Sequence, residues 1–153
     1  MKLLKYNIIA ILLTVLTLGM NSCVEADPEF VHEDNFISAM VCMSGRTNAS
    51  PTLNGTVYEY DKNGMILQEG FTAEDAAGGS GVIVFIVDRE NHDKFDLTDV
   101  FLRATVTYDA FIYPTLSGKH NILVTEENPE GKVFAVKSGT GVVRKYRVMG
   151  IYE

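Results

Sequence analysis

The sequence predicts an all-β protein, folded as a β-sandwich of about seven to eight antiparallel strands. Short runs rich in Val, Ile, Tyr and Phe recur through most of the chain, and turns rich in Gly, Asn and Ser separate them. Almost no segment has a helical period. The chain of 153 residues leaves room for one domain with a single two-layer core, so a sandwich is the architecture that these strands favour.

Residues 1–22 precede these strands and have the composition of a secretory signal. Lys2 and Lys5 form a short basic region, and the apolar run 8–18 follows it. About twenty apolar residues usually span a bilayer core, so this shorter run favours a cleaved signal over a retained transmembrane helix. We therefore predict a lipoprotein signal peptide over 1–22.

Cys23 is the residue in this region that points to a specific chemistry. A lipid-modified cysteine needs a small residue before it, and Ser22 meets that need. We predict that acyl chains such as palmitate on Cys23 hold the protein on a membrane, because two or more chains anchor stably. A disulfide between Cys23 and Cys42 is the alternative. The polar, acidic residues 23–34 are expected to tether the lipid to the domain 35–153.

The first half of the domain alternates expected strands with turns. Strands are expected at 35–43, 56–61 and 65–69, with a loop at 44–55. Asn63-Gly64 between two β-prone runs predicts a hairpin, since both residue types tolerate positive φ. A single helical turn is expected next. It covers residues 72–77, where Thr72 and Asp75 have the spacing of a capping box, and a glycine-rich turn at 78–81 ends it.

The run 82–87, VIVFIV, is the most hydrophobic strand candidate of the domain. It has no polar alternation, which predicts a central strand covered on both faces, or one whose open face meets a partner. A charged loop is expected at 88–96, and a half-buried strand with regular alternation at 100–108. The short runs at 121–125 and 132–137 are further strand candidates.

The last strand candidate, 142–152, has two different faces. One face carries Val142, Arg144, Tyr146 and Val148, and the other carries Val143, Lys145, Arg147 and Met149. The second set is basic at its start. This pattern predicts either a strand with one solvated side or an edge strand protected by charge.

Charge and cysteine content exclude several classes of protein. The chain carries 13 basic and 20 acidic residues, a formal net charge of −7, and removal of 1–22 makes it −9. No basic stripe is present, so a nucleic-acid partner is not expected. The lone Cys42 lies in an apolar run and is predicted to be a core residue, and no cysteine pattern indicates a zinc or redox cofactor.

The sequence contains no recognisable catalytic or metal-binding motif. Ser80 does not match the G-x-S-x-G pattern of a nucleophile, and His92 lies among charged residues without further metal ligands. Residues 61–64 resemble the start of a calcium-binding loop, but the later acidic ligands of such a loop are missing. We expect no enzyme activity, no metal and no cofactor. Tyr58, Tyr60 and Tyr113, if they are exposed, are candidate ligand-binding residues, because aromatic faces stack on sugars. The alternative is that Tyr58 and Tyr60 are ordinary core or cross-strand residues.

Several short motifs carry a resemblance to a known group of proteins. They are D-N-F-I-S at 34–38, Y-D-K-N-G at 60–64, L-S-G-K-H at 116–120 and V-K-S-G-T-G-V-V-R-K-Y-R-V at 136–148, together with the Cys23 anchor. With them, the chain resembles Bacteroidetes lipoproteins of unknown function that hold a single immunoglobulin-like β-sandwich domain. The resemblance implies an outer-membrane lipoprotein, exposed at the cell surface, and a link to glycan capture.

Three functions agree with these features. The first is a non-catalytic binding or accessory module that takes carbohydrate or joins an outer-membrane protein complex, and an exposed aromatic cluster would favour it. The second is a structural or assembly subunit, which an open apolar sheet face or edge would favour. The third is a hydrolase with an unrecognised site, which a cleft of converging carboxylates with shifted pKa values would favour.

Overall fold

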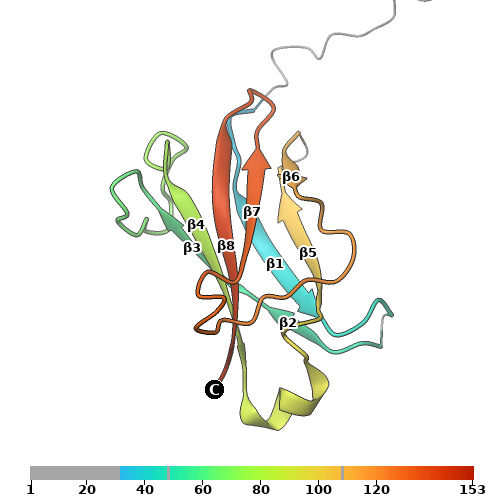
Figure 1. Cartoon of the computed structure of the whole chain (residues 1–153). Coiled ribbons are helices and arrows are strands. Elements are labelled where there is room, and N and C mark those ends of the chain that lie inside the picture. Colours follow the sequence, from blue (N-terminus) through green and yellow to red (C-terminus); the bar gives the residue numbers. More distant parts are fainter. Residues whose placement is uncertain (1–31, 48, 108) are drawn as a thin grey trace, which may run out of the picture. The chain divides into compact units, whose positions relative to one another are not determined.

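The structure, a computed structural model, describes residues 32–47, 49–107 and 109–153. The signal peptide 1–22, Cys23 and most of the tether lie outside these residues. Almost all of the regular secondary structure in the described part is strand, which confirms the predicted all-β sandwich (Figure 1). The strands are β1 (Ile37–Met43), β2 (Thr52–Asn54), β3 (Thr56–Tyr60), β4 (Ser80–Val87), β5 (Phe101–Val106), β6 (Phe111–Tyr113), β7 (Lys132–Lys137) and β8 (Val143–Tyr152), with one 3-10 helix, η3 (Arg89–Lys94).

The strands form two sheets that pack against each other. One sheet has the order β2-β1-β5, and the other has the order β3-β4-β8-β7-β6. In Figure 1, β7 and β8 lie in front of β1. Alternate side chains of both sheets point inward and form one apolar core, as two-layer packing requires. Its largest fully buried side chains include Tyr146, Phe85, Phe134, Ile37 and Met40.

β8 has the two faces that its alternation predicts. Arg144, Tyr146 and Val148 are buried, whereas Lys145 and Arg147 are exposed. The strand lies between β4 and β7, so the interpretation as an edge strand is wrong and the basic residues mark a solvated side.

β4 is a central strand, as its unbroken hydrophobic run predicts. Ile83, Phe85 and Val87 are buried in the core, whereas Ile86 on the opposite side is exposed. The pairing of β4 with β8 is parallel, which the prediction of antiparallel strands did not include. A continuous apolar run is typical of parallel strands, so the run in β4 is the sequence feature that indicates the parallel pairing.

Four predicted segments differ from the structure. Residues 65–69 form no strand. Of the expected hairpin there remain the bridge Tyr60–Ile66 and the backbone bonds from the Leu67 amide to Glu59 and from the Asp61 amide to Met65. Residues 121–125 form only a bridge between Leu123 and Gly150. The expected loops at 44–55 and 88–96 contain β2 and η3.

The turn at Asn63-Gly64 and the capping box of Thr72 and Asp75 both form, although the turn does not lead into a second strand. At the Asn63-Gly64 turn, Gly64 has φ of 79°, and the Asn63 amide donates to Asp61. In the capping box, the Thr72 amide donates to Asp75 Oδ2 at 2.8 Å, and the Asp75 amide donates to Thr72 Oγ1 at 3.2 Å.

The last residues of the predicted tether are joined to the sandwich. The His32 amide donates to Asp109 Oδ2 at 2.6 Å, and the Thr107 hydroxyl donates to the Asp34 carbonyl at 3.1 Å. Residues of the segment 32–34, which belongs to the predicted tether, are therefore hydrogen-bonded to the sandwich.

Candidate functional site

The outward side of the five-stranded sheet is the candidate site, and we call it the outer face. Residues paired across neighbouring strands point to the same side, so the register defines the face row by row. The rows are Tyr60–Ser80–Lys145–Ala135–Tyr113, Tyr58–Val82–Arg147–Val133, Thr56–Val84–Met149, Ile86–Ile151 and Val143–Lys137–Phe111.

Exposed hydrophobic side chains concentrate on the outer face. Ten large hydrophobic side chains of the described residues are exposed, and seven of them lie here: Tyr58, Ile86, Phe111, Tyr113, Val133, Val143 and Ile151. Phe111 is the most exposed of the seven, at 69%. Exposed apolar groups scattered singly are normal, whereas their concentration on one side makes the outer face the candidate interaction surface.

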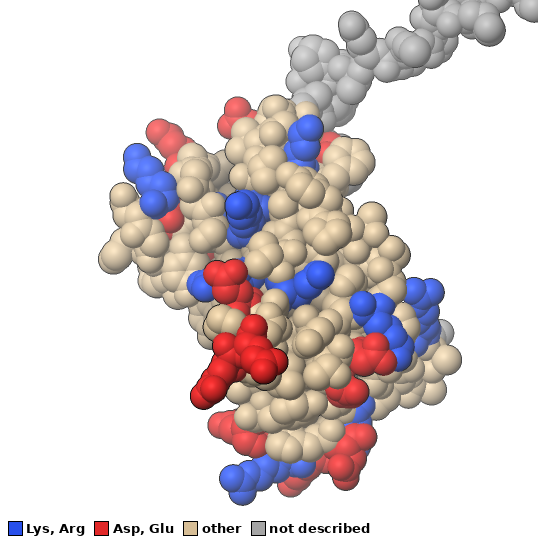
Figure 2. Space-filling view, viewed as in Figure 1, with Lys and Arg blue, Asp and Glu red and all other residues tan. Residues whose placement is uncertain are grey.

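The outer face has a charge opposite to that of the whole chain. Lys137, Lys145 and Arg147 point outward from β7 and β8, and all three are exposed. None of the residues in the rows above is Asp or Glu, although acidic residues outnumber basic ones in the chain. Figure 2 shows separate Lys and Arg side chains over the region of β7 and β8, and acidic ones gathered at the loop before β7.

The structure places all three candidate tyrosines on the outer face. Tyr58 and Tyr60 are neighbours on the same side of β3, whereas Tyr113 lies on β6 at the opposite edge of the sheet. Tyr58 is 38% exposed and Tyr113 is 44% exposed, so neither is a core residue. Tyr60 and Tyr113 share one row, and four strand spacings separate them, about 19 Å.

The rows divide the outer face into two halves with different chemistry. The basic–aromatic half contains Tyr58, Tyr60, Phe111, Tyr113, Lys137, Lys145 and Arg147. The aliphatic half, towards the other end of β4 and β8, contains Val84, Ile86, Met149 and Ile151. The first half offers rings and cations to a ligand, and the second offers only apolar surface.

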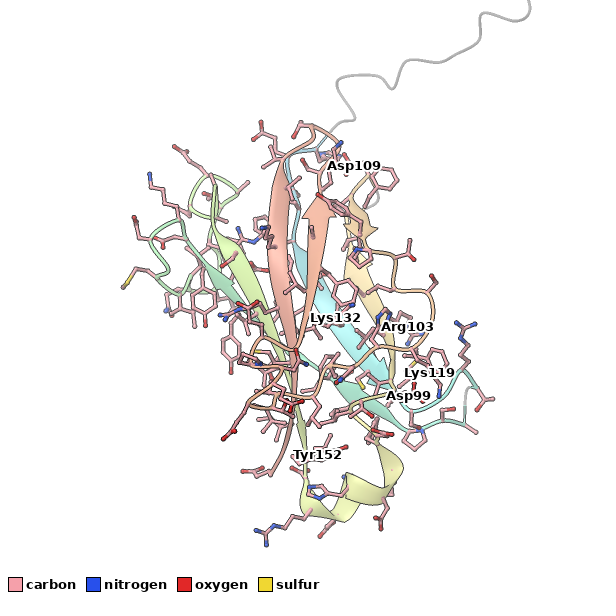
Figure 3. All side chains as sticks on the ribbon, viewed as in Figure 1. Asp99, Arg103, Asp109, Lys119, Lys132 and Tyr152 are labelled. Carbon is pink, nitrogen blue, oxygen red and sulfur yellow. The ribbon has the colours of Figure 1, made fainter. Side chains whose placement is uncertain are left out.

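A second group of cations lies on the other sheet, around Phe101 of β5. The Arg46 guanidinium lies 4.7 Å from the centre of the Phe101 ring, and the Lys119 ammonium lies 5.9 Å from it. Lys119 is also paired with Asp99, which neutralises part of this group (Figure 3). Arg103 is exposed on the same strand.

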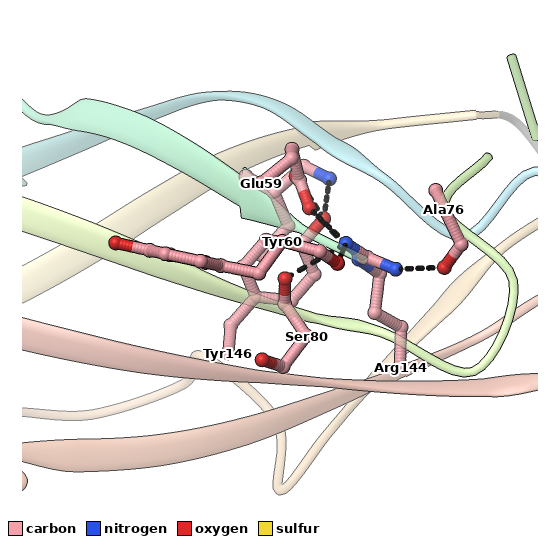
Figure 4. Close-up of polar contacts among 7 residues, drawn as sticks. Glu59, Tyr60, Ala76, Ser80, Arg144 and Tyr146 are labelled. Carbon is pink, nitrogen blue, oxygen red and sulfur yellow. Dashed lines mark hydrogen bonds and ion pairs between the residues drawn. The ribbon is translucent and has the colours of Figure 1, made fainter. Parts of the chain in front are cut away.

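A buried polar network holds the inner side of β3 and β8 together (Figure 4). Arg144 Nε donates to Glu59 Oε2 at 2.8 Å, and the guanidinium also donates to the carbonyl oxygens of Ala76, Tyr60 and Ser80. The Tyr146 hydroxyl donates to Glu59 Oε1 and accepts from the Ile37 amide at 3.0 Å. The donors of Arg144 are thus used within the fold.

Burial dominates the acid–base properties of this network. It raises the pKa of Glu59, although the hydrogen bond from Tyr146 and the charge of Arg144 oppose the rise. Burial also raises the pKa of Tyr146, and the adjacent Glu59 carboxyl adds to the effect. Both oxygens of Glu59 have partners, so this carboxyl serves the fold rather than a reacting group.

A small cavity lies beside the network, at the end of the sheet near the 72–79 segment. Its volume is about 110 Å³, and Asn35, Phe36, Ala76 and Arg144 are among its lining residues. The Glu33 side chain is the carboxyl at this cavity, and Glu59 is turned towards Arg144 and Tyr146 instead. This cavity therefore lacks the pair of converging carboxylates that would favour a hydrolase.

His92 and Cys42 both pack against other side chains of the fold. His92 is exposed on η3 and packs edge-on against Tyr152, with ring centres 4.8 Å apart. Within the described residues, no three His, Cys, Asp or Glu side chains lie close enough to hold a metal ion. Cys42 is fully buried in the core, as predicted, and burial raises the pKa of its thiol to about 12.

Comparison with known proteins leaves the family of this chain open. No protein-family description matches the sequence, and no curated protein matches it. A crystal structure of a candidate secreted protein from Bacteroides fragilis is similar, with 12% identity and a TM-score of 0.42 over 79% of this chain and 97% of that one. A TM-score at this level carries no argument about function. Among the described residues, no helix has the length and apolar character to cross a membrane.

Proposed function

We propose that this protein is a non-catalytic binding module of the bacterial cell envelope, anchored by lipid at Cys23, that binds a glycan on its outer face. The observation that carries the proposal is the concentration of exposed rings and apolar side chains on one side of the five-stranded sheet. A flat, open strand face suits an extended ligand better than a small molecule, which would need a deep pocket.

The tyrosines are the groups that favour a glycan. Tyr58 and Tyr60 stand side by side on β3 with part of each ring accessible, and Tyr113 and Phe111 offer rings at the far edge. Aromatic rings present a large, rigid contact area at little cost in conformational entropy. The outer face thus has stacking surfaces at both of its edges.

A glycan array tests this proposal. The chain 24–153, without signal peptide and anchor, is applied as wild type, as Tyr58→Ala and as Tyr113→Ala. We expect binding of at least one glycan class, weakened by each tyrosine variant. Phe101→Ala is the matched control, because it removes a ring from the outer side of the other sheet. An array without any bound glycan, or equal loss in the control, contradicts the proposal.

Membrane attachment is tested separately. In bacteria that express the full chain, we expect wild-type protein in the outer-membrane fraction, labelled by a palmitate analogue and accessible to protease added to intact cells. Cys23→Ala should remove both the label and the membrane attachment. A Cys23→Ala protein that stays with the membrane contradicts the lipid anchor.

Assembly with an outer-membrane protein is the second candidate function, and the aliphatic half of the outer face favours it. Ile86 and Ile151 are exposed and lie side by side on β4 and β8, where they offer no hydrogen bonds to a sugar. Ile86→Asp and Ile151→Asp should abolish co-purification with a partner protein if this function applies, and should leave glycan binding unchanged.

A further inference from the structure

We infer that the ligand of the basic–aromatic half is a negatively charged glycan, with carboxylate or sulfate groups, that runs across the strands from Tyr60 to Tyr113. This inference rests on the proposed function and adds the charge of the ligand and its direction on the sheet. Its basis is the position of Lys137, Lys145 and Arg147 among the rings.

The cations of this half are available to a ligand. Lys137, Lys145 and Arg147 are exposed, and none of them forms an ion pair with a carboxylate of the described residues. Lys145 and Arg147 stand two positions apart on β8, so their side chains leave the sheet about 7 Å from each other. Because no outward row holds an acidic residue, the positive charge of this half is not neutralised within the face.

The row from Tyr60 to Tyr113 gives the ligand its path. Lys145 stands in the middle of this row, and its neighbours on the two sides are the small residues Ser80 and Ala135. A ring is therefore available at each end and a cation at the centre, with low side chains between them. A chain of several sugars can lie in this row, stack at both ends and place an acidic group at Lys145.

Charge also decides against a second copy of the protein as the occupant. A twofold axis through the basic–aromatic half would bring Lys145 and Arg147 of one chain against the same cations of the other, and like charges repel. A ligand that carries negative charge gains from the same groups. The aromatic rings at the two edges of the sheet favour a glycan over other anions, because a chain of sugars can stack on both.

The test compares probes of one length and different charge. Full-length wild-type protein in non-ionic detergent is titrated with pentagalacturonate, its methyl ester, a sulfated pentasaccharide and its unsulfated form, all at 50 mM salt. We expect the charged member of at least one pair to bind at least tenfold more tightly, and a digalacturonate to bind weakly because it cannot reach both rings. The two pairs distinguish a carboxylate ligand from a sulfate ligand.

Matched variants connect the result to the outer face. Lys145→Gln with Arg147→Gln should weaken binding of the charged probe about tenfold and remove most of its salt dependence. Arg89→Gln with Lys94→Gln removes the same charge from η3 and should leave binding unchanged. Equal effects of the two double variants would overturn the inference.

Other outcomes separate this inference from the proposed function. Tyrosine-dependent binding of the neutral probes alone would overturn the charge of the ligand but leave a glycan-binding module. Binding of a thymidine decanucleotide as tightly as the charged glycan would show a general affinity for polyanions and would overturn the inference. Absence of binding by every glycan probe would overturn both proposals.

Discussion

Replacement of Arg144 by Met should destabilise the domain more than any change to an exposed residue of β8. Met fills a similar length but leaves Glu59 and the carbonyl oxygens of Ala76, Tyr60 and Ser80 without their donor. Removing one partner of a buried ion pair costs about 3–5 kcal/mol in the free energy of unfolding. For a domain of this size, that loss lowers Tm by about 10–20 °C.

Urea denaturation followed by circular dichroism measures the effect, with Arg147→Met as the matched control. Arg147 lies three positions along the same strand but points to solvent, so its loss should change the free energy of unfolding by less than about 0.5 kcal/mol. Adding Glu59→Gln to Arg144→Met should recover part of the loss, because it removes the unpaired carboxyl. Equal effects of Arg144→Met and Arg147→Met would refute the role given to the network.

Three further predictions concern the core. Burial raises the folded pKa of Glu59 above its ordinary value of 4.5, so the folded state keeps a proton that the unfolded chain has lost. The stability of wild type relative to Glu59→Gln should therefore fall as pH rises from 4.5 through the folded pKa, and a rising difference contradicts this. Gly81→Ala should cost about 1–3 kcal/mol in urea denaturation, since its Cβ would overlap the Tyr146 ring; unchanged stability contradicts it. Cys42 should resist a thiol reagent at pH 8 and react fully in urea, and rapid labelling of native protein contradicts its burial.

Alternation along the strands was enough to predict much of the fold and part of the site. From residue 143 to 148 the two sets of the last strand separate into exposed and buried faces as expected, because the period of a strand does not depend on its neighbours. Val142, which precedes the strand, is exposed although it belongs to the inward set. The same period placed Tyr58 and Tyr60 side by side. It could not place Tyr113 in the row of Tyr60, since that depends on the order of five strands.

The buried network is the feature that sequence patterns missed. Glu59 and Arg144 lie 85 positions apart, and no local pattern joins them. A signal was present in each strand: Arg144 falls on the apolar side of β8, and Glu59 falls on the side of β3 opposite to Tyr58 and Tyr60. A charged residue on a buried face requires a partner, but the partner's identity follows only from the pairing of β3 with β4 and of β4 with β8.

The parallel pairing of β4 with β8 also determines how the chain reaches its folded state. Val82 and Arg147 are neighbours in the sheet although 65 positions separate them (82 to 147), so the two halves of the larger sheet meet only through a non-local encounter. Such contacts slow folding into the range of milliseconds to seconds. Until β8 arrives, the apolar strand β4 has a free edge that another unfolded chain can occupy. Refolding yield should therefore decrease as protein concentration rises.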